Sequence, residues 1–403
     1  MKILVVSQYY YPEQFRINDI CAELVKKGHQ VTVLTGRPNY PKGEIFPGYE
    51  NDKKEEIIDG VHVIRCKCRP RHKGIFNLAR NYLSFVYQGC KQVNKLKDRY
   101  DVVYVYGISP VTMAIPALFY KLLNKVPVYY YCMDIWPEAV REISSDKILS
   151  KYHPVYLVAW LLSTIIYYFV DIIGVKCNQF GDYLADTCFV SKNKIRLLYE
   201  HAEESYLDVS EIPIKNDCYD FMFLGNIGSS QNCEMLIKAL GKIDSQKEYK
   251  LHFVGDGSAL NNLKELVEQL GMKDKVVFHG RKKLDEINRF YNLADCCLLT
   301  LSNKTACGLT PPGKLYSYMA SGRPIIAAAE GATKSIVNDN DCGICVEPDE
   351  IKKLSTAMNY AINNSREFAK KGLKARMYFK DNFTINKHIS ILIEQLENTA
   401  RGN

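Results

Sequence analysis

The sequence predicts an α/β protein built from two doubly wound domains, each a mainly parallel sheet with helices on both faces. With 403 residues, the chain exceeds one ordinary core and suits two domains of about 150–200 residues each. In both halves, short apolar runs rich in β-branched and aromatic residues alternate with helical patterns, as in parallel sheets. The content of 47% hydrophobic and 24% charged residues is that of a globular chain. Such paired domains bind ligands where the carboxyl ends of their strands face each other across a cleft.

The first domain is expected to span residues 1–204. A helical pattern over Asn18–Lys27 follows the first strand and ends at Gly28. The expected strands are Lys2–Ser7, Gln30–Thr35, Val61–Arg65, Asp101–Tyr106, Val126–Tyr131, Ile172–Val175 and Lys194–Leu198.

The second domain is expected to span residues 205–385 and begins with the polar stretch Asp208–Asp217. Its expected strands are Phe221–Leu224, Tyr249–Val254, Val276–His279, Cys296–Leu301, Pro324–Ala328 and Ile344–Val346. The last segment, 386–403, contains an apolar helical pattern over Asn386–Asn398 and could cross back to the first domain.

The cysteines and the start of the chain predict a cytoplasmic protein. Fourteen cysteines are scattered through apolar runs, as buried thiols in a reducing compartment are. The first residues form a strand-like run without the three parts of a secretory signal.

The net charge of +8 is concentrated in one segment. Residues 61–100 contain ten Lys or Arg against one acid, Asp98. This basic segment either meets an anionic partner or is a solvated face. It includes the aromatic-rich run Ile75–Tyr87, a pattern that suits a helix lying on anionic lipid. No nucleic-acid recognition module accompanies the charge, so we expect contact with the inner face of a membrane and not with nucleic acid.

A second stretch bears on the membrane. Tyr152–Val170 has 19 residues without a formal charge, which is the lower limit for a bilayer span. It contains Pro154 and polar hydroxyls and leads directly into an expected strand. We therefore expect a buried helix, with surface docking on a bilayer and a true span as the alternatives.

Two segments are candidates for phosphate binding. In the first, Gly225, Asn226, Gly228 and Ser229 follow a strand and precede the helical run Asn232–Leu240. Glycines let the backbone approach a ligand, and free amides at a helix start attract phosphate. The alternative is an ordinary tight turn, and no Walker-type lysine follows.

The second candidate segment is Thr310–Ala327, a loop followed by a proline-opened helix and a strand. Lys314 falls in the first turn of this helix, where the helix dipole disfavours a cation unless an anion binds there as well. A diphosphate would supply that anion. The alternative is an exposed lysine in water.

These segments resemble the retaining glycosyltransferases of family 4, which have the GT-B fold of two Rossmann-like domains. The resemblance covers nearly the whole chain. Phe253–Gly257 is similar to the family's Val-Gly-Asp-Gly turn, which makes Gly255 a candidate donor contact. A narrower similarity, to O-antigen and capsule N-acetylfucosaminyltransferases and colanic-acid transferases, rests on Tyr9–Glu13, Thr35–Gly43 and Asp134–Glu138.

The chain departs from the family at two places. The usual Glu-x7-Glu pair, which contacts the donor sugar and ribose, is replaced by Leu309 and Ser317. The usual basic pair after the first strand of the second domain is replaced by Asn226 and Gln231. These losses leave Lys314 as the main candidate cation for a donor diphosphate.

The resemblance implies roles for further residues. Asp134 and Glu138 follow a strand and are the candidate catalytic acids, and Trp136 could stack on a sugar ring. Their alternative is a Pro-terminated loop with solvated acids. The remaining candidates are Gly280 and Arg281 beside the donor base, Thr310 and Ser317 in the donor site, and Arg16, Asn39 and Tyr40 toward the acceptor. No metal-ligand spacing is present among the histidines, and Cys342–Cys345 is a lone CxxC, so we expect neither metal nor cofactor.

The sequence thus predicts a glycosyltransferase that uses a nucleotide diphosphate-sugar, most simply a UDP-sugar, and a lipid-linked saccharide acceptor of surface polysaccharide synthesis. Two other functions stay open: a sugar-nucleotide epimerase on the same fold, and a non-catalytic partner subunit that has lost the usual acids.

Overall fold

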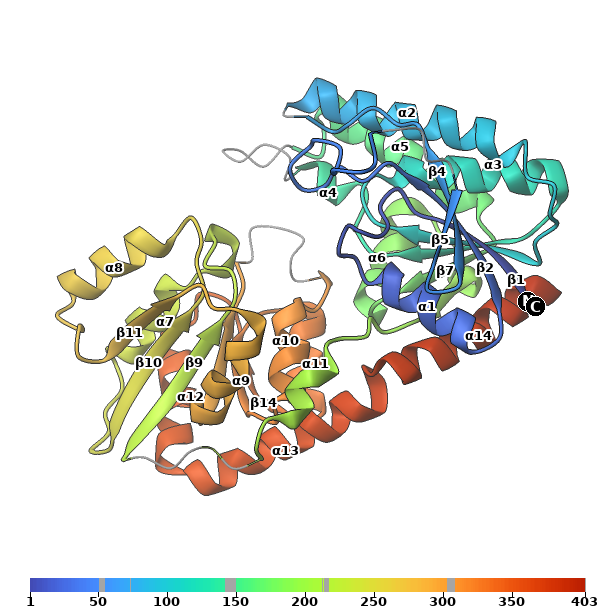
Figure 1. The fold of residues 1–403 in the computed structure, drawn as a ribbon. Coiled ribbons are helices and arrows are strands. Elements are labelled where there is room, and N and C mark those ends of the chain that lie inside the picture. The colour runs from blue at the N-terminus through green and yellow to red at the C-terminus, as the bar shows by residue number, and fades with distance from the viewer. Residues whose placement is uncertain are drawn as a thin grey trace. The chain divides into compact units, whose positions relative to one another are not determined.

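The computed structural model describes residues 1–50, 55–72, 74–141, 150–211, 213, 217–302 and 309–402, with the side chains of Ile75 and Ser229 outside this set. The chain divides into two compact units. The first unit comprises residues 1–199 and 388–403, and the second comprises residues 200–387. Each unit contains a sheet flanked by helices (Figure 1), which confirms the predicted fold class.

The first sheet has the strand order β3-β4-β2-β1-β5-β6-β7-β8. Only β3, at the edge, pairs antiparallel in the described part of the sheet. The sequence analysis does not predict β3, because two of its four residues are glutamates and it pairs with one neighbour alone. The strands are β1 (Lys2–Val6), β2 (Gln30–Gly36), β3 (Glu55–Ile58), β4 (Val61–Cys66), β5 (Val102–Gly107), β6 (Val128–Cys132), β7 (Ile172–Val175) and β8 (Ile195–Leu197).

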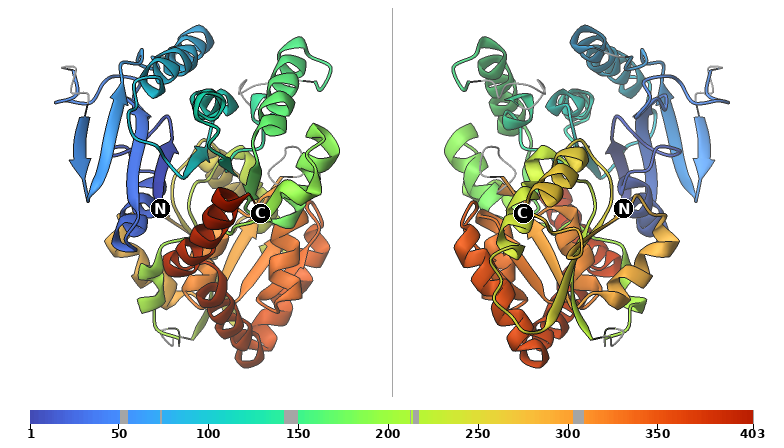
Figure 2. Two further views of the ribbon diagram at one scale, coloured as in Figure 1. Left: turned by 90° about the vertical axis from the view of Figure 1, so that its right-hand side faces the viewer. Right: turned by 90° about the vertical axis from the view of Figure 1, so that its left-hand side faces the viewer.

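Helices cover both faces of this sheet (Figures 1 and 2). On one face lie α2 (Ile75–Val93), α3 (Ile115–Asn124), α5 (Pro154–Phe169) and α6 (Asn178–Cys188), and on the other lie α1 (Ile17–Lys26) and α14 (Ile385–Arg401). The short helices of this unit are η1 (Val111–Ala114), α4 (Glu138–Arg141) and η2 (Lys192–Lys194).

Strand β6 anchors a helix on each face. The ring of Tyr130 packs against Tyr167 of α5, with centroids 5.7 Å apart. The ring of the next residue, Tyr131, lies 5.7 Å from that of His388 in α14. Successive side chains of a strand point to opposite faces, so a run of tyrosines serves both layers.

Helix α5 corrects the expectation of a buried helix. Its inner side is buried, but its outer side exposes apolar side chains: Leu157 (47%), Val158 (58%), Leu161 (51%), Ile165 (45%) and Tyr168 (73%). Uniform hydrophobicity predicts burial on all sides, whereas α5 contacts the sheet on one side only. In the part of the chain that the structure describes, no helix has the length and hydrophobicity needed to cross a bilayer.

The second sheet is parallel throughout its described pairings, with the order β11-β10-β9-β12-β13-β14. Its strands are β9 (Cys218–Leu224), β10 (Glu248–Val254), β11 (Val276–Gly280), β12 (Cys296–Thr300), β13 (Ile325–Ala328) and β14 (Gly343–Val346). The helices of this unit are η3 (Glu204–Asp208), η4 (Ser229–Gln231), α7 (Glu234–Leu240), α8 (Leu260–Gln269), α9 (Leu284–Leu293), α10 (Gly313–Ala320), α11 (Gly331–Asp339), α12 (Ile351–Asn363) and α13 (Ser365–Asn382).

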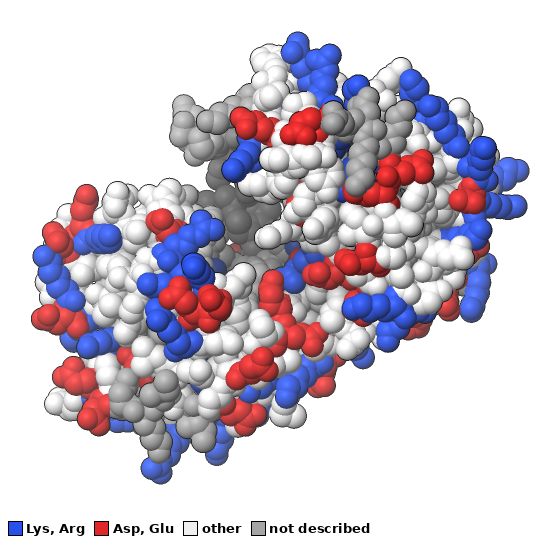
Figure 3. All heavy atoms as spheres, viewed as in Figure 1, with Lys and Arg blue, Asp and Glu red and all other residues white. Residues whose placement is uncertain are grey.

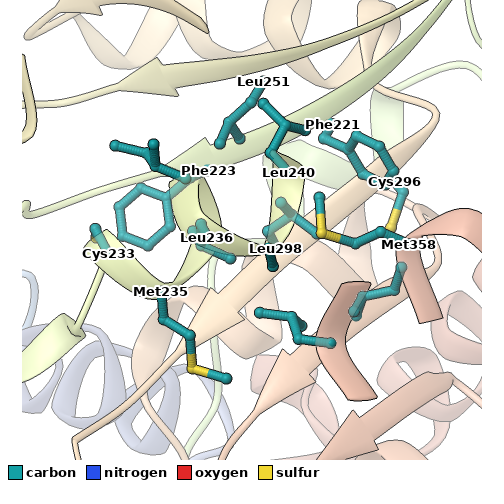
Figure 4. Packing of buried hydrophobic residues seen from close by; sticks show 14 of the residues in the cluster. Phe221, Phe223, Cys233, Met235, Leu236, Leu240, Leu251, Cys296, Leu298 and Met358 are labelled. Atoms are coloured by element: carbon teal, nitrogen blue, oxygen red, sulfur yellow. The ribbon is translucent and has the colours of Figure 1, made fainter. Parts of the chain in front are cut away.

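The core of the second unit lies between this sheet and helices α7, α8 and α12. Phe221 and Phe223 of β9 pack with Leu236 of α7 and Met358 of α12 (Figure 4). All four are 0% exposed, and burial of such a side chain contributes about 1.5–3 kcal/mol. This packing fixes the carboxyl ends of β9 and β10. The turns that follow these strands are therefore held in place at one end.

Candidate functional site

Three glycine turns meet at the carboxyl ends of β9, β10 and β11. The amide of Gly225 donates to Val254 O at 2.9 Å, and the amide of Gly255 donates to Gly280 O at 3.0 Å. All three glycines have a positive φ. The structure therefore brings together three glycines that lie 30 and 25 residues apart and that the sequence analysis assigned to the donor site.

The contact between the first two turns leaves no room for a side chain. A Cβ on Gly255 would lie 1.9 Å from the carbonyl oxygen of Gly225, and one on Gly257 would lie 2.4 Å from that of Ile227. Both obstacles are backbone atoms, which cannot move aside without changing the turns. Glycine is needed here because two loops approach backbone to backbone.

Lys314 reaches this group of turns from the start of α10. Its Nζ donates to Oε1 of Gln231 at 2.6 Å and lies 3.9 Å from the ring centroid of Phe223. Its Cε and Nζ are 3.5 and 3.7 Å from where a Cβ of Gly225 would be. Burial lowers the pKa of Lys314 to about 8. No carboxylate is recorded as its partner among the described residues, so a half-buried cation lies beside a glycine turn and a helix start.

Gln231 has a role that the sequence analysis missed. The sequence shows only that a basic residue is absent at this position, whereas the structure shows its side chain holding Lys314. The main chain of the same segment is also fixed, because Thr300 Oγ1 donates to Gln231 O and the Ser302 amide donates to Ser230 O at 2.8 Å. Since 83 residues separate Gln231 and Lys314, no local sequence pattern reveals the contact.

Tyr318 is the second residue that the sequence analysis missed. Its buried hydroxyl accepts from the amide of Leu224 at 3.0 Å and donates to the carbonyl of Leu224 at 3.2 Å. It therefore fixes the last residue of β9, directly before Gly225. A helix position four residues after Lys314 faces the same way, which is the spacing that could have indicated it.

The other predicted donor residues border this group. Asn226 lies within the first turn, and its side chain approaches both Gly228 and Gly257. Ser317 of α10 lies against Tyr291, and Thr310 is partly buried just before α10. Arg281 is exposed after β11, and the side chain of Ser229 is outside the described set.

In the first unit, the buried carboxylate of Glu13 joins two loops. It accepts from the amides of Asn39 and Tyr40 at 2.8 and 2.7 Å, and from the amide of Tyr10 at 3.3 Å. Burial raises the pKa of Glu13 to about 7, against the opposing effect of these amides. Glu13 thus positions the loop after β2 relative to the loop after β1, and this role was not predicted.

Two of the predicted acceptor residues, Asn39 and Tyr40, differ in how far their side chains are exposed to a ligand. The side chain of Asn39 is buried and used internally, because it accepts from the Arg71 amide and donates to the Arg37 carbonyl. Tyr40 is 38% exposed and packs on Tyr9 under the guanidinium of Arg71. Of these two, Tyr40 offers a surface to a ligand and Asn39 shapes the loop.

Arg16 is the third predicted acceptor residue. It is the N-cap residue of α1, at the end of the loop that follows β1. Arg16 is partly buried and already has interactions within the chain.

Asp134 follows β6 and is held at one oxygen. Its Oδ2 accepts from the amide and the hydroxyl of Ser109, at 2.9 and 2.7 Å, and Trp136 Nε1 donates to the same hydroxyl at 3.0 Å. In the described parts of the chain, Oδ1 of Asp134 has no hydrogen-bond partner, and the residue is partly exposed. The carboxylate is therefore fixed in orientation with one oxygen available.

Glu138 differs from Asp134 in its surroundings. It is 5% exposed, and its oxygens accept from Arg141 at 2.7 Å, Tyr183 at 2.9 Å and Tyr156 at 3.0 Å. Burial raises its pKa, but these hydrogen bonds outweigh that effect and hold the pKa below its usual value. This arrangement favours a positioning role for Glu138, through α4 and α5, over direct contact with a substrate.

Two family models match the chain in succession. Residues 14–199 match the glycosyl transferase 4-like domain, and residues 208–383 match the glycosyl transferases group 1. The first match lies within the first unit and the second within the second unit.

Known glycosyltransferases are similar to this chain over most of their length. The chain is 22% identical to the putative colanic acid biosynthesis glycosyl transferase WcaI of Escherichia coli, over 93% of this chain and 96% of that protein. It is also 22% identical to an alpha-monoglucosyldiacylglycerol synthase of Streptococcus pneumoniae, over 85% of this chain and 74% of that protein. The fold is shared with Anabaena HepE in complex with UDP, with a TM-score of 0.69, 14% identity and coverage of 99% and 100%.

Fold and matches together define an enzyme that transfers sugars. The chain is a glycosyltransferase with the GT-B fold, and a glycosyltransferase domain model matches each of its two units.

Proposed function

We propose that this enzyme transfers a sugar, with retention, from a UDP-sugar to a lipid-linked saccharide in the synthesis of a bacterial surface polysaccharide such as a capsule or O-antigen. In this proposal, residues 1–204 hold the acceptor and residues 205–385 hold the donor. The colanic acid relative and the lipid-glycosylating relative support the acceptor class, and the UDP complex of HepE supports the donor. Retention rests on the resemblance to family 4.

The observation that carries the proposal is the position of Lys314. A half-buried cation with one neutral partner lies beside the Gly225 turn, in the first turn of α10. Oriented donors in a partly desolvated site stabilise the charge that develops on a leaving diphosphate. The diphosphate charge is met by Lys314 and backbone amides, in place of the basic pair that most family members use.

The pKa of Lys314 predicts how donor binding depends on pH. The side chain is charged below about pH 8, so affinity for UDP should fall by about tenfold between pH 7 and pH 9. The Lys314→Met variant should bind weakly with a flat profile. Calorimetric titration with UDP at several pH values measures both. A pH-independent affinity in the wild type would exclude Lys314 as the diphosphate contact.

Asp134 is the proposed catalytic carboxylate on the acceptor side. Its free Oδ1 could accept a hydrogen bond from the acceptor hydroxyl or from the donor sugar. In the reaction that family 4 implies, the acceptor oxygen bonds to the anomeric carbon as the bond to the diphosphate breaks. The departing phosphate oxygen takes the acceptor proton, so the protein need not supply a nucleophile.

Membrane association is the third part of the proposal. Lys and Arg side chains gather along the edge of the first unit that α2 and α3 form (Figure 3). Helix α5, on the same face of the sheet, exposes eight large apolar side chains. Exposed apolar patches of this kind mark interaction sites, and basic residues near an anionic bilayer add to the attraction.

The test is transfer of radiolabelled sugar from UDP-sugars to lipid extracted from capsule-forming bacteria. Labelled lipid that depends on the enzyme supports the proposal. An epimerase would convert the donor without any lipid, and a non-catalytic subunit would bind none of a panel of UDP-, GDP- and dTDP-sugars. Either result would overturn the proposed transfer from a UDP-sugar to a lipid-linked acceptor.

Asp134→Asn is the matched inactive variant for this assay. The amide oxygen can keep the bonds from Ser109, while the charge is lost, so transfer should fall by about 100-fold. UDP affinity should stay unchanged, because the substitution lies in the first unit. Full transfer activity in this variant would remove Asp134 from the proposed mechanism.

A further inference from the structure

A pocket of about 570 Å³ lies in the first unit, apart from the residues assigned above to donor and catalysis. It opens between the residues that follow β2 and β4 and the outer side of α2. Arg37 contributes from the first loop, Lys67 and Arg69 from the second, and Arg80 from the helix. We call it the basic pocket.

The three arginines of the basic pocket have no acidic partner in the part of the chain that the structure describes. Four basic side chains line it and no acid does, and among the described residues no carboxylate pairs with Arg37, Arg69 or Arg80. Nη2 of Arg37 donates to Cys68 O at 3.1 Å, while its Nε is buried without a partner. A buried donor without an acceptor is costly, and a bound anion would satisfy it.

Apolar side chains adjoin this charge. Arg80, Leu83, Ser84 and Tyr87 share one side of α2, because they lie three or four residues apart. Leu83 is 65% exposed and Tyr87 is 67% exposed, and both line the pocket. A free phosphate ion would use the arginines alone, whereas an amphiphile would use both kinds of side chain.

The pocket is joined to the predicted acceptor loop. The Arg69 amide donates to Ser84 Oγ at 2.9 Å, and Asn81 Nδ2 donates to the Arg69 carbonyl at 2.6 Å, so the loop after β4 is tied to α2. Asn39 Nδ2 donates to the carbonyl of Arg37 at 2.8 Å. A ligand in the basic pocket is therefore close to the loop that carries Tyr40.

We propose that the basic pocket binds the phosphate group of a membrane lipid, with the arginines on the phosphate oxygens and Leu83 and Tyr87 against the apolar part. Arginine suits this task because its planar donors match phosphate oxygens. The inference rests on the proposed function only for the identity of that lipid, which would be the carrier of the acceptor saccharide.

The test compares vesicle binding of two double variants of the whole chain. Arg69→Gln/Arg80→Gln removes two charges from the pocket, and Lys95→Gln/Lys97→Gln removes two from the same basic segment outside it. Cosedimentation is measured with phosphatidylcholine vesicles that contain phosphatidic acid, or phosphatidylserine at matched surface charge. We expect the pocket variant to bind phosphatidic acid vesicles at least about tenfold more weakly, and the other variant to lose much less.

The outcomes separate the possible sources of binding. Preference for phosphatidic acid that only the pocket variant loses supports the proposal. Equal losses in both variants, or no preference between the two lipids, would show a diffuse charged surface and overturn it. Calorimetry with inorganic phosphate is the last control. If free phosphate binds as tightly as the vesicles do, the pocket is a site for phosphate ions and not for a lipid.

The same preparations separate this proposal from the proposed function. UDP affinity should be equal in all three proteins, since the substitutions lie in the first unit, and an equal value also shows that each is folded. A chain that binds phosphatidic acid through the pocket but transfers no sugar to lipid would retain the inference and lose the proposed function.

Discussion

Lys314→Met is expected to weaken UDP binding by at least about 100-fold. The ammonium is half-buried beside the Gly225 turn, where a charge-assisted bond to a diphosphate is shielded from water. Loss of one such donor from a preorganised site costs about 10²–10³ in rate, and we expect a loss of UDP affinity of similar size. Methionine keeps an unbranched side chain of similar length but lacks the ammonium that lies 3.9 Å from the Phe223 ring centroid.

The Lys314→Met variant should be as stable as the wild type or more stable when no ligand is bound. Burial lowers the pKa of Lys314, which means that the folded protein disfavours this charge when no ligand is bound. Removal of the charge should leave the free energy of unfolding equal to or above that of the wild type.

Calorimetry with UDP and thermal unfolding without UDP measure the two effects. Lys352→Met, at an exposed position of α12, is the matched control and should bind UDP as the wild type does. Unchanged affinity in Lys314→Met would show that the diphosphate binds elsewhere.

Gly255→Ala is expected to have the largest effect on stability. The new methyl group would lie 1.9 Å from the carbonyl oxygen of Gly225, so the turns after β9 and β10 must separate. Backbone displacement in a packed region places this substitution among the severe ones, at roughly 3–5 kcal/mol of unfolding free energy. UDP binding should be lost with it.

Gly271→Ala is the control for this prediction. Gly271 also has a positive φ, but no heavy atom lies within 4 Å of the position of a Cβ. It should cost only the left-handed conformational penalty of about 1 kcal/mol. Equal destabilisation by the two substitutions would contradict the proposed clash.

The chain offers an internal reference for this measurement. Both tryptophans, Trp136 and Trp160, lie in the first unit. Circular dichroism during denaturation reports both units, whereas tryptophan fluorescence reports the first. Gly255→Ala should shift part of the dichroism transition and leave the fluorescence transition near that of the wild type.

Much of the fold could be predicted because local patterns and burial agree. The runs that form β5, β12 and β13 are buried throughout and almost wholly apolar, as expected for strands covered on both faces. The edge strand β3 escaped prediction because its half-exposed residues carry no such pattern. Helix α5 was placed correctly in the sequence, but its exposed outer side depends on what packs against it, which periodicity cannot supply.

The candidate site was predicted unevenly for the same reason. Gly225 was found because it follows a strand and precedes a helical run, and Gly255 and Gly280 were found through the resemblance to family 4. The structure brings them together because the carboxyl ends of parallel strands share one edge of the sheet. Gln231, Tyr318 and Glu13 were missed, since each acts on a partner that is distant in the sequence or on a main-chain group. Asp134 and Glu138 look equivalent in the sequence, and their hydrogen bonds distinguish them.

The sequence by itself determined the two parallel sheets, the glycine turns and the lysine at the start of α10, because each depends on residue type and spacing along the chain. Only the tertiary structure decided that Gln231 holds Lys314, that Asp134 keeps a free oxygen while Glu138 does not, and that four basic residues from three segments line one pocket. Those relations arise when the chain brings distant segments into contact, and the distances and burial that result set which charges are paired and which remain available.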